Sequence, residues 1–398
     1  MTPEALDAAD PLRRYRDQFE LPHGMIYLAG HSLGPPPRRT IARVAEVIQN
    51  EWGHTLAPAW ERHDWIHAPQ RVGGKIAQLI GADAEEVLAA DSTSVNLFKL
   101  LGALMLLKPE RKAVLIESGE FPTDMHVAQG AVAAFGKGRR MKFAPKGRLA
   151  DRIDERVGFV IASHVHYRDA RIRDMAALQK RAQEAGALLI WDLSHSAGAI
   201  PVDLHAAYAD FAIGCGYKHL NGGPGAPAYL YVAKRWQDDL ANPISGWLGH
   251  AAPFSFVDAY APAEGIARFQ AGTPSIIAMA AFEAALDLIL ETSAEARRAK
   301  ALSLQRVFLE TVFAKRPAGL TLLSPEDDAL RAGHVSLRHR QAETLIAILA
   351  AQGVIGDFRP PDVMRFSFSP LFTAHIEAAR AGEILLAALR SARVRERI

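Results

Sequence analysis

Three short apolar runs lie within "ALLIWDLSHSAGAIPVDLHAAYADFAIGCGYKHLNGGPGAPAYLYVA", Ala187–Ala233. The runs "ALLIWDLS", "DFAIGCG" and "AYLYVA" have the length and composition of buried strands. Four similar runs precede them, namely "MIYLA", "EVLAAD", "AVLIES" and "GFVIASHV". Segments between these runs, such as "PQRVGGKIAQLIGA", space their apolar residues three and four apart, as helices with one buried face do. The alternation predicts an α/β fold with a mostly parallel seven-stranded sheet.

The pattern of alternating strands and helices stops at a stretch rich in Pro, Gly and aromatic residues, Asn242–Pro274. A long helical segment, "PSIIAMAAFEAALDLILETS", follows it with proline at its first position. We therefore expect a large domain over residues 29–274 and a smaller α+β domain over residues 275–398. Residues 1–28 are expected to pack with the small domain.

The charge balance favours a small-molecule partner over a nucleic acid or a membrane. The 398 residues include 46 basic and 44 acidic side chains, a formal net charge of +2. Such a molecule exerts no long-range attraction on polyanions or anionic lipids. No run of about 18 apolar residues is present, which argues against a membrane span. The single cysteine, Cys215, gives no support to an oxidising compartment, so a cytoplasmic location is expected.

Polar residues that directly follow the predicted strands are the candidates for chemistry, because ligands of open parallel sheets bind at the carboxyl ends of the strands. Asp192 follows a run apolar enough to be buried, and a carboxylate there needs a cation, a helix N-terminus or a protonated ligand nitrogen. It could instead simply cap the next helix. Lys218 ends another apolar run and could form a Schiff base with a carbonyl, or it could be a solvated surface lysine.

Together the lysine and the aspartate suggest pyridoxal phosphate, which needs a lysine for its aldehyde and an acid for its pyridine nitrogen. The segment "DSTSVNLF" offers the hydroxyls of Ser92, Thr93 and Ser94 at a helix start, which is a suitable site for a phosphate. A plain serine cap is the alternative. Phe121, after "AVLIES", could stack on a flat ring or serve only as core packing.

At these residues the sequence resembles the kynureninase family, whose members are aspartate-aminotransferase-like (fold type I) pyridoxal-phosphate enzymes. The resemblance extends from about Ile26 to Thr373. Its most specific stretch is Trp191–Val232, and "DSTSVNLFKLL", "FPTD", "SGWLGHAAPF" and "RFQAGTP" occur in matching order. The combination is specific, whereas each piece alone is weak.

The resemblance implies a role for each matching residue. Lys218 looks like the Schiff-base lysine and Asp192 like the partner of the pyridine nitrogen, with His195 beside the ring. The implied phosphate ligands are Thr93, Ser94 and Tyr217; Phe121 would stack on the ring, and Asp124 and Ser163 match further cofactor contacts. Trp247 and Thr273 match residues that the family supplies from a neighbouring subunit, which implies a homodimer with shared active sites. Arg365 looks like the residue that binds the α-carboxylate of the substrate.

The implied reaction is cleavage of the bond between Cβ and Cγ of L-kynurenine or 3-hydroxy-L-kynurenine, a step of tryptophan catabolism. The products would be L-alanine and anthranilate or 3-hydroxyanthranilate. Lys218 would act as the base on the α-proton, and Tyr217 is a plausible proton donor.

Three features depart from the family pattern. The N-terminal motif usually reads "GNSLG", and here it is "GHSLG", which places His31 at the substrate end. After "ASHV" the family often carries Asn, Tyr, Arg, Thr and Gly, whereas this chain has "HYRDA", so that Asp169 and Ala170 replace the last two. Phe372 stands where tyrosine is common, which removes a hydroxyl.

Other readings of the same residues stay open. A fold type I lyase or aminotransferase acting on a different amino acid needs the same lysine and aspartate, and a catalytically silent relative that binds pyridoxal phosphate is a further alternative. A cysteine desulfurase is disfavoured because Cys215 falls in an apolar strand rather than on a mobile loop. His164 and His166 would share a face of an extended strand, but no third metal ligand with convincing spacing accompanies them, so no metal is expected.

Overall fold

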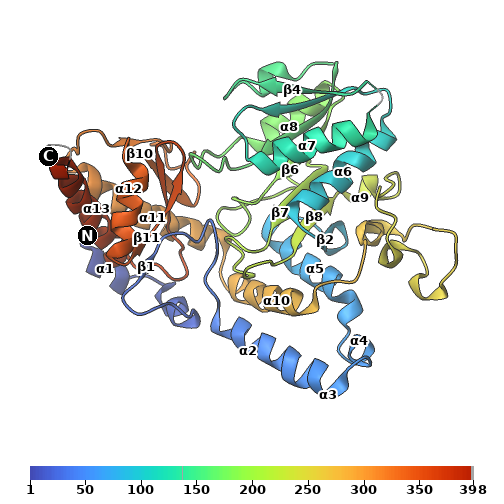
Figure 1. Ribbon diagram of the computed structural model, residues 1–398, viewed down its shortest axis with the longest axis horizontal. Coiled ribbons are helices and arrows are strands. Elements are labelled where there is room, and N and C mark those ends of the chain that lie inside the picture. Colours follow the sequence, from blue (N-terminus) through green and yellow to red (C-terminus); the bar gives the residue numbers. More distant parts are fainter. Residues whose placement is uncertain (137, 396–398) are drawn as a thin grey trace.

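A central seven-stranded sheet organises the first two thirds of the chain (Figure 1). The computed structural model describes residues 1–136 and 138–395. In the order β2-β8-β7-β6-β5-β3-β4, the strands are β2 (Val87–Ala89), β8 (Ala228–Val232), β7 (Phe211–Cys215), β6 (Leu188–Asp192), β5 (Val157–Ser163), β3 (Ala113–Glu117) and β4 (Arg140–Ala144). β8 is antiparallel to β2 and β7, and the other neighbours are parallel. The predicted mostly parallel seven-stranded sheet is confirmed.

One member of the sheet differs from the expectation. The run "MIYLA" does not enter the large sheet, because Ile26–Tyr27 (β1) pairs in parallel with Val354–Ile355 (β11) instead. The seventh strand is β4, which pairs with β3. Its sequence, "RMKFA", has no continuous apolar run, since it is an edge strand that leaves most of its residues partly exposed. Periodicity alone therefore misses it.

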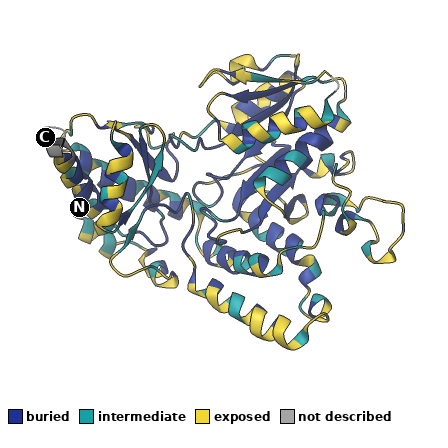
Figure 2. Cartoon of the chain, viewed as in Figure 1, coloured by how far each residue is buried: buried dark blue, intermediate teal, exposed yellow. Residues whose placement is uncertain are grey.

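Helices cover both faces of the sheet, as parallel strands require. One face packs against α5 (Ala68–Ile80), α8 (Met175–Glu184) and α10 (Ile276–Leu290), and the other packs against α6 (Thr93–Leu107) and α7 (Pro122–Phe135). Apart from the edge strand β4, the strands between them are almost completely buried (Figure 2). This double burial explains the unbroken apolar runs of the sequence.

The last third of the chain forms a second layered unit around its own core. An antiparallel sheet in the order β12-β13-β10-β9 consists of β12 (Asp357–Arg359), β13 (Val363–Ser367), β10 (His334–Arg338) and β9 (Thr321–Leu322). The accompanying helices are α11 (Ala294–Phe313), α12 (Ala342–Ala351) and α13 (His375–Arg395). The N-terminal helix α1 (Pro3–Ala8) contacts α13, and β1 joins β11. α10 contacts α2 and α5.

Two exposed segments project from the large sheet (Figures 1 and 2). The first is an arm made of α2 (Arg38–Glu46), a π-helical turn (Val47–Trp52), α3 (Gly53–Thr55) and α4 (Ala59–Arg62). The second is the loop over residues 250–262, beyond α9 (Lys234–Gln237). Both carry exposed large apolar side chains, namely Ile41, Ile48, Trp52 and Leu56 on the arm and Phe254, Phe256, Val257 and Tyr260 on the loop. Within the described ranges, no helix combines the length and the apolar character needed to cross a bilayer.

Candidate active site

A cavity of about 520 Å³ opens at the carboxyl ends of β2, β3, β5, β6 and β7. Strand ends of a parallel sheet meet at one edge, so residues far apart in the sequence line the same cavity. The structure brings these predicted residues to its wall: Thr93, Ser94, Phe121, Asp124, Ser163, Asp192, His195, Tyr217 and Lys218. Four predicted residues do not line it: His31, Trp247, Thr273 and Arg365.

Lys218 is a buried lysine that faces the cavity, with 9% of its surface exposed. Its Nζ lies 3.1 Å from His195 Nε2 and 5.6 Å from the centre of the Phe121 ring. Burial, together with the charge of Lys218, holds the pKa of His195 well below its ordinary value. The imidazole is therefore neutral at pH 7, and its Nε2 can accept a hydrogen bond from Lys218 Nζ.

Two carboxyl groups, those of Asp124 and Asp192, also line the cavity. Asp192 Oδ1 accepts a hydrogen bond from the backbone N–H of Ser194 at 2.8 Å. Both oxygens of Asp124 are buried without a hydrogen-bond partner. Burial and the nearby charge of Asp192 raise the pKa of Asp124 well above its ordinary value. A pair of buried carboxyls with an unused acceptor is a site for a cationic N–H donor from a ligand.

The N-terminus of α6 provides the anion-binding end of the cavity. Ser92 caps the helix, because its Oγ accepts from the Val95 N–H at 3.3 Å. Ser92 therefore has the helix-capping role that was the alternative to phosphate binding in the sequence analysis. The next two side chains, Thr93 and Ser94, line the cavity together with the free N–H groups of the first helical turn. They can hold a phosphate.

Tyr217 adds a phenol beside the lysine. Burial, together with the charges of Cys215 and Asp192, raises the pKa of Tyr217 to about 12. The hydroxyl therefore keeps its proton throughout the neutral range. It can donate a hydrogen bond to a phosphate oxygen or a proton to a developing anion.

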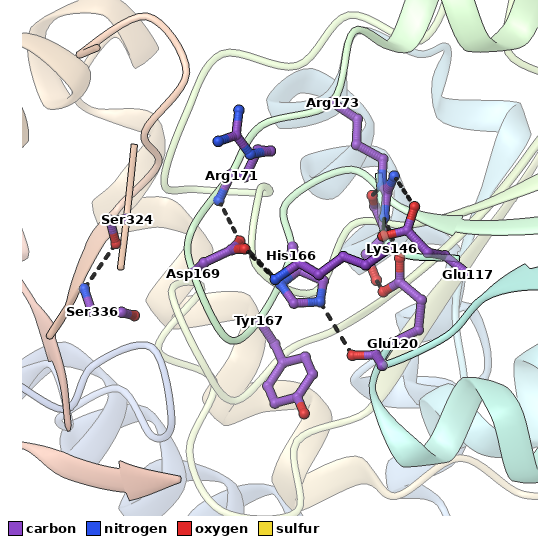
Figure 3. A network of polar contacts seen from close by, with 12 residues as sticks. Glu117, Glu120, Lys146, His166, Tyr167, Asp169, Arg171, Arg173, Ser324 and Ser336 are labelled. Atoms are coloured by element: carbon purple, nitrogen blue, oxygen red, sulfur yellow. Dashed lines mark hydrogen bonds and ion pairs between the residues drawn. The ribbon is translucent and has the colours of Figure 1, made fainter. Parts of the chain in front are cut away.

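The loop after β3 is anchored by an ion cluster beneath the cavity (Figure 3). Glu120 accepts hydrogen bonds from Ser163 Oγ at 2.6 Å and from Arg173 Nη2 at 2.6 Å. Arg173 also pairs with Glu117 at 3.1 Å and donates to the Ser163 carbonyl at 3.0 Å. The hydroxyl of Ser163 is thus engaged by Glu120. Glu120 and Arg173 were not among the predicted site residues, since an ion pair between positions 53 apart leaves no local pattern.

Arg365 and His31 lie together behind the cavity. Arg365 is 1% exposed and makes a bidentate pair with Asp357, with Nε to Oδ1 at 2.7 Å. Its Nη1 donates to the backbone carbonyl of Tyr167 at 2.6 Å. His31 is fully buried, and its Nε2 lies 3.4 Å from Asp357 Oδ2, although neither ring nitrogen has a hydrogen-bond partner. Burial and the charge of Arg365 lower the pKa of His31 to about 4.

Trp247 and Thr273 are exposed and lie away from the cavity of their own chain. Trp247 is 44% exposed and packs edge-on against Phe254 of the projecting loop, with the ring centres 5.8 Å apart. The structure of one chain therefore does not bring these two residues to Lys218.

Tyr167 is a cavity residue that the sequence interpretation missed. It directly follows His166, which was considered only as a metal ligand. Its ring packs edge-on against Phe121, with the centres 5.3 Å apart. Two signals were available, namely its place shortly after a predicted strand and its match to the tyrosine of the family pattern.

The surroundings of Cys215 and of the two histidines after β5 differ from those of a desulfurase cysteine or of a metal centre. Cys215 lines the cavity from within β7, and burial raises the pKa of its thiol. His166 binds Asp169 and the Gly119 carbonyl. Among the described residues, the group that could hold a metal is Asp83, Glu86 and His205. There Glu86 already accepts from His205 and from two backbone N–H groups.

The cavity fits pyridoxal phosphate. Lys218 would hold the aldehyde, the buried carboxyl pair would meet the protonated pyridine nitrogen, and the start of α6 would bind the phosphate. The observation that supports the fit is the pair of buried carboxyls, Asp124 and Asp192, at the cavity wall. A cationic N–H donor at that end would offset the repulsion between the two groups.

Comparison with known proteins agrees with this geometry. The profile of the "Kynureninase C-terminal domain" family matches residues 298–385. A protein of Deinococcus radiodurans named kynureninase is 46% identical over 386 residues, covering 95% of this chain and 93% of its own. A kynureninase of Pseudomonas fluorescens is 43% identical, with 96% and 93% covered.

Solved structures with much lower sequence identity share the fold. A cysteine desulfurase of Thermococcus onnurineus superposes with a TM-score of 0.82 at 19% identity, covering 95% of this chain and 98% of its own. The cystine C–S lyase C-DES superposes with a TM-score of 0.79 at 18% identity, with 92% and 98% covered. A likeness at this identity establishes the common architecture only.

Proposed function

The chain belongs to the kynureninase family of fold type I enzymes, and we propose that it uses pyridoxal phosphate to hydrolyse the Cβ–Cγ bond of L-kynurenine or 3-hydroxy-L-kynurenine. The products are L-alanine and anthranilate or its 3-hydroxy form. The observation that carries the proposal is the 42–46% identity to kynureninases over nearly the whole chain. The cavity around Lys218 supports the proposal, because Asp192, His195 and Tyr217 line it together with the lysine.

Pyridoxal phosphate, when bound, supplies an electron-withdrawing pyridinium ring that takes up the charge left when a bond at the substrate Cα breaks. Asp192 would hold the ring nitrogen and keep it protonated. Asp124, whose pKa is raised by burial and by Asp192, would add a second carboxyl at that end of the cavity. We propose that the two carboxyls act as one unit.

Lys218 is proposed to move the α-proton of the substrate. Its amine needs a neighbour that can accept a hydrogen bond from it without adding positive charge to the site. Neutral His195, 3.1 Å away, meets that need because its pKa is held well below the ordinary value. A cationic histidine there would instead repel the ammonium form of the lysine.

Tyr217 is proposed to donate a proton at the substrate β-carbon after the bond breaks. Its raised pKa, about 12, keeps the proton on the phenol until an anion develops nearby. The ring lies next to Lys218, with Nζ 5.8 Å from the ring centre. Acid and base therefore stand on adjacent residues.

The substrate end is proposed to contain Arg365 and His31. Arg365 uses three of its five N–H groups for Asp357 and the Tyr167 carbonyl, which leaves two for a substrate carboxylate. Asp357 fixes the plane of the guanidinium and thereby the direction of those remaining donors.

The working unit is proposed to be a homodimer with shared sites. Trp247 and Thr273, which the family resemblance assigns to the cofactor of a neighbouring subunit, are exposed and remote from their own cavity. The exposed apolar arm and loop offer surfaces that a second copy would cover. Mixing inactive Lys218→Ala chains with inactive Trp247→Ala chains and reassociating them should restore about a quarter of wild-type activity, since half of the dimers would carry one intact site of two. Absence of recovery in verified hybrid dimers would rule out sharing.

Anthranilate fluorescence provides the test of the activity itself. Purified holoenzyme given L-kynurenine should release anthranilate and L-alanine in equal amounts, and Lys218→Ala should release neither. A coloured cofactor that reacts only with other amino acids would indicate a different lyase or an aminotransferase. Reaction with no amino acid would indicate a silent binder. We further propose a cytoplasmic role in tryptophan catabolism, for which the single, buried cysteine is the supporting feature.

A further inference from the structure

The tight turn His166–Ala170 carries the segment that departs from the family pattern, and it forms part of the cavity wall. The turn is closed by hydrogen bonds from the Ala170 N–H to the His166 carbonyl at 2.9 Å and from the His166 N–H to the Arg171 carbonyl at 3.0 Å. Ala170 has φ = +61°, a left-handed conformation that costs a residue with a side chain about 1 kcal/mol. Something in the turn must offset that strain.

The offsetting contacts come from His166 and Asp169, both 5% exposed. His166 Nδ1 lies 3.0 Å from Asp169 Oδ1, and His166 Nε2 lies 3.2 Å from the Gly119 carbonyl (Figure 3). Both neighbours present acceptor oxygens, so a protonated ring nitrogen on either side can donate a hydrogen bond to one of them.

Asp169 is held as a carboxylate from several sides. Burial raises its pKa, but hydrogen bonds from His166 and from Lys146 outweigh burial, and the net effect holds the pKa of Asp169 below its ordinary value. Lys146 Nζ lies 2.8 Å from Oδ2, and the Arg171 N–H donates to Oδ1 at 3.1 Å. The contact between His166 and the Asp169 carboxylate therefore acts as a brace within the turn.

The brace connects three parts of the candidate site. Through the Gly119 carbonyl it ties the turn to the loop that presents Phe121. Tyr167, inside the turn, packs its ring on Phe121 and points away from Asp169 (Figure 3). The Tyr167 carbonyl accepts the hydrogen bond from Arg365 Nη1. Small displacements of the turn therefore move both the aromatic wall and the guanidinium.

We propose that His166 and Asp169 are a coupled pair of positioning residues that sets the substrate side of the site through Tyr167 and Arg365. The inference rests on the proposed function. The pair also explains two departures together, since His166 stands at the asparagine position and Asp169 at the threonine position of the family pattern. A histidine and an aspartate that contact each other replace an asparagine and a threonine in one turn.

The test is a double-mutant cycle of the holoenzyme with His166→Asn, Asp169→Thr and the double variant. Each single change should raise KM for L-kynurenine about tenfold, the value of one charge-assisted hydrogen bond, while kcat and cofactor occupancy fall less than threefold. The double variant should lose far less than the product of the two single effects, because neither member of the His166–Asp169 contact is left buried without the other.

His205→Asn is the matched control, because it removes another histidine–carboxylate contact, 2.6 Å to Glu86, outside the cavity. Its KM should stay within twofold of wild type. If Asp169→Thr does not fold, Asp169→Asn removes the charge with nearly the same shape. Independent, multiplicative effects, or losses confined to kcat and thermal stability, would overturn the pairing. A wild-type enzyme that releases no anthranilate would instead contradict the proposed function.

Discussion

His31→Asn should make the enzyme less sensitive to acid. His31 is fully buried, stacks on His334 with the ring centres 4.9 Å apart, and has Asp357 Oδ2 3.4 Å from its Nε2. Burial, followed by the charge of Arg365, outweighs the opposing effect of Asp357 and lowers the pKa of His31 to about 4. An unfolded histidine has a pKa of about 6.5. Between about pH 4 and pH 6.5, His31 therefore carries a proton in the unfolded chain but not in the folded chain.

The sign and the size of the effect follow from this difference. A depressed histidine pKa contributes stability that is present above about pH 6.5 and is lost as the pH falls toward 4. From the two pKa values, protonation of His31 in the unfolded chain lowers the free energy of unfolding by about 0.2 kcal/mol at pH 7 and by about 2 kcal/mol at pH 5. In His31→Asn the fall in unfolding free energy from pH 7 to pH 5 should be smaller by about 2 kcal/mol. The substitution itself adds a cavity cost that is the same at both pH values and cancels.

The measurement is urea unfolding of both proteins at pH 7 and pH 5, in equal excess cofactor, followed by tryptophan fluorescence. The exposed His23 provides the control, because His23→Asn should leave the difference between the two pH values unchanged. Identical pH dependence of wild type and His31→Asn, with equal m-values, would refute the assignment of a neutral, proton-rejecting histidine at this position.

Two further substitutions test how the site is supported. A Cβ at Gly34 would lie 2.1 Å from Asn221 Oδ1 and 2.5 Å from the Lys218 carbonyl, so Gly34→Ala should weaken cofactor binding at least tenfold in an absorbance titration. Gly130→Ala is the control, because the space around Gly130 is open and cofactor affinity should not change. Equal affinities of the two variants would show that the Lys218 segment can shift to accommodate the methyl group. Arg173→Met leaves the buried carboxylates of Glu117 and Glu120 without their cation and should cost about 3–5 kcal/mol in thermal unfolding. Arg156→Gln, at an exposed pair, should leave the melting temperature unchanged, and a similarly stable Arg173→Met would mean that the cluster is dispensable.

The fold was predictable where one segment contains the whole physical cause. A strand buried on both faces must be apolar throughout, and this requirement made β5, β6, β7 and β8 visible in the sequence. The edge strand β4 was missed, because half-exposed residues remove that requirement. Ile26–Tyr27 was assigned to the wrong sheet, since an apolar run does not specify which partner it pairs with.

The sequence by itself also determined which residues meet in the cavity, from Thr93 to Lys218. Parallel strands end at a common edge of the sheet, so the residues that follow them lie close together there. Only the tertiary structure decided what those residues face. Asp192 has the buried Asp124 beside it. Outside the cavity wall, Arg365 pairs with Asp357 and the Tyr167 carbonyl, and His166 contacts Asp169 and the Gly119 carbonyl. The reason is physical: the protonation and direction of a buried polar group depend on neighbours brought together by packing, and sequence spacing does not encode those distances.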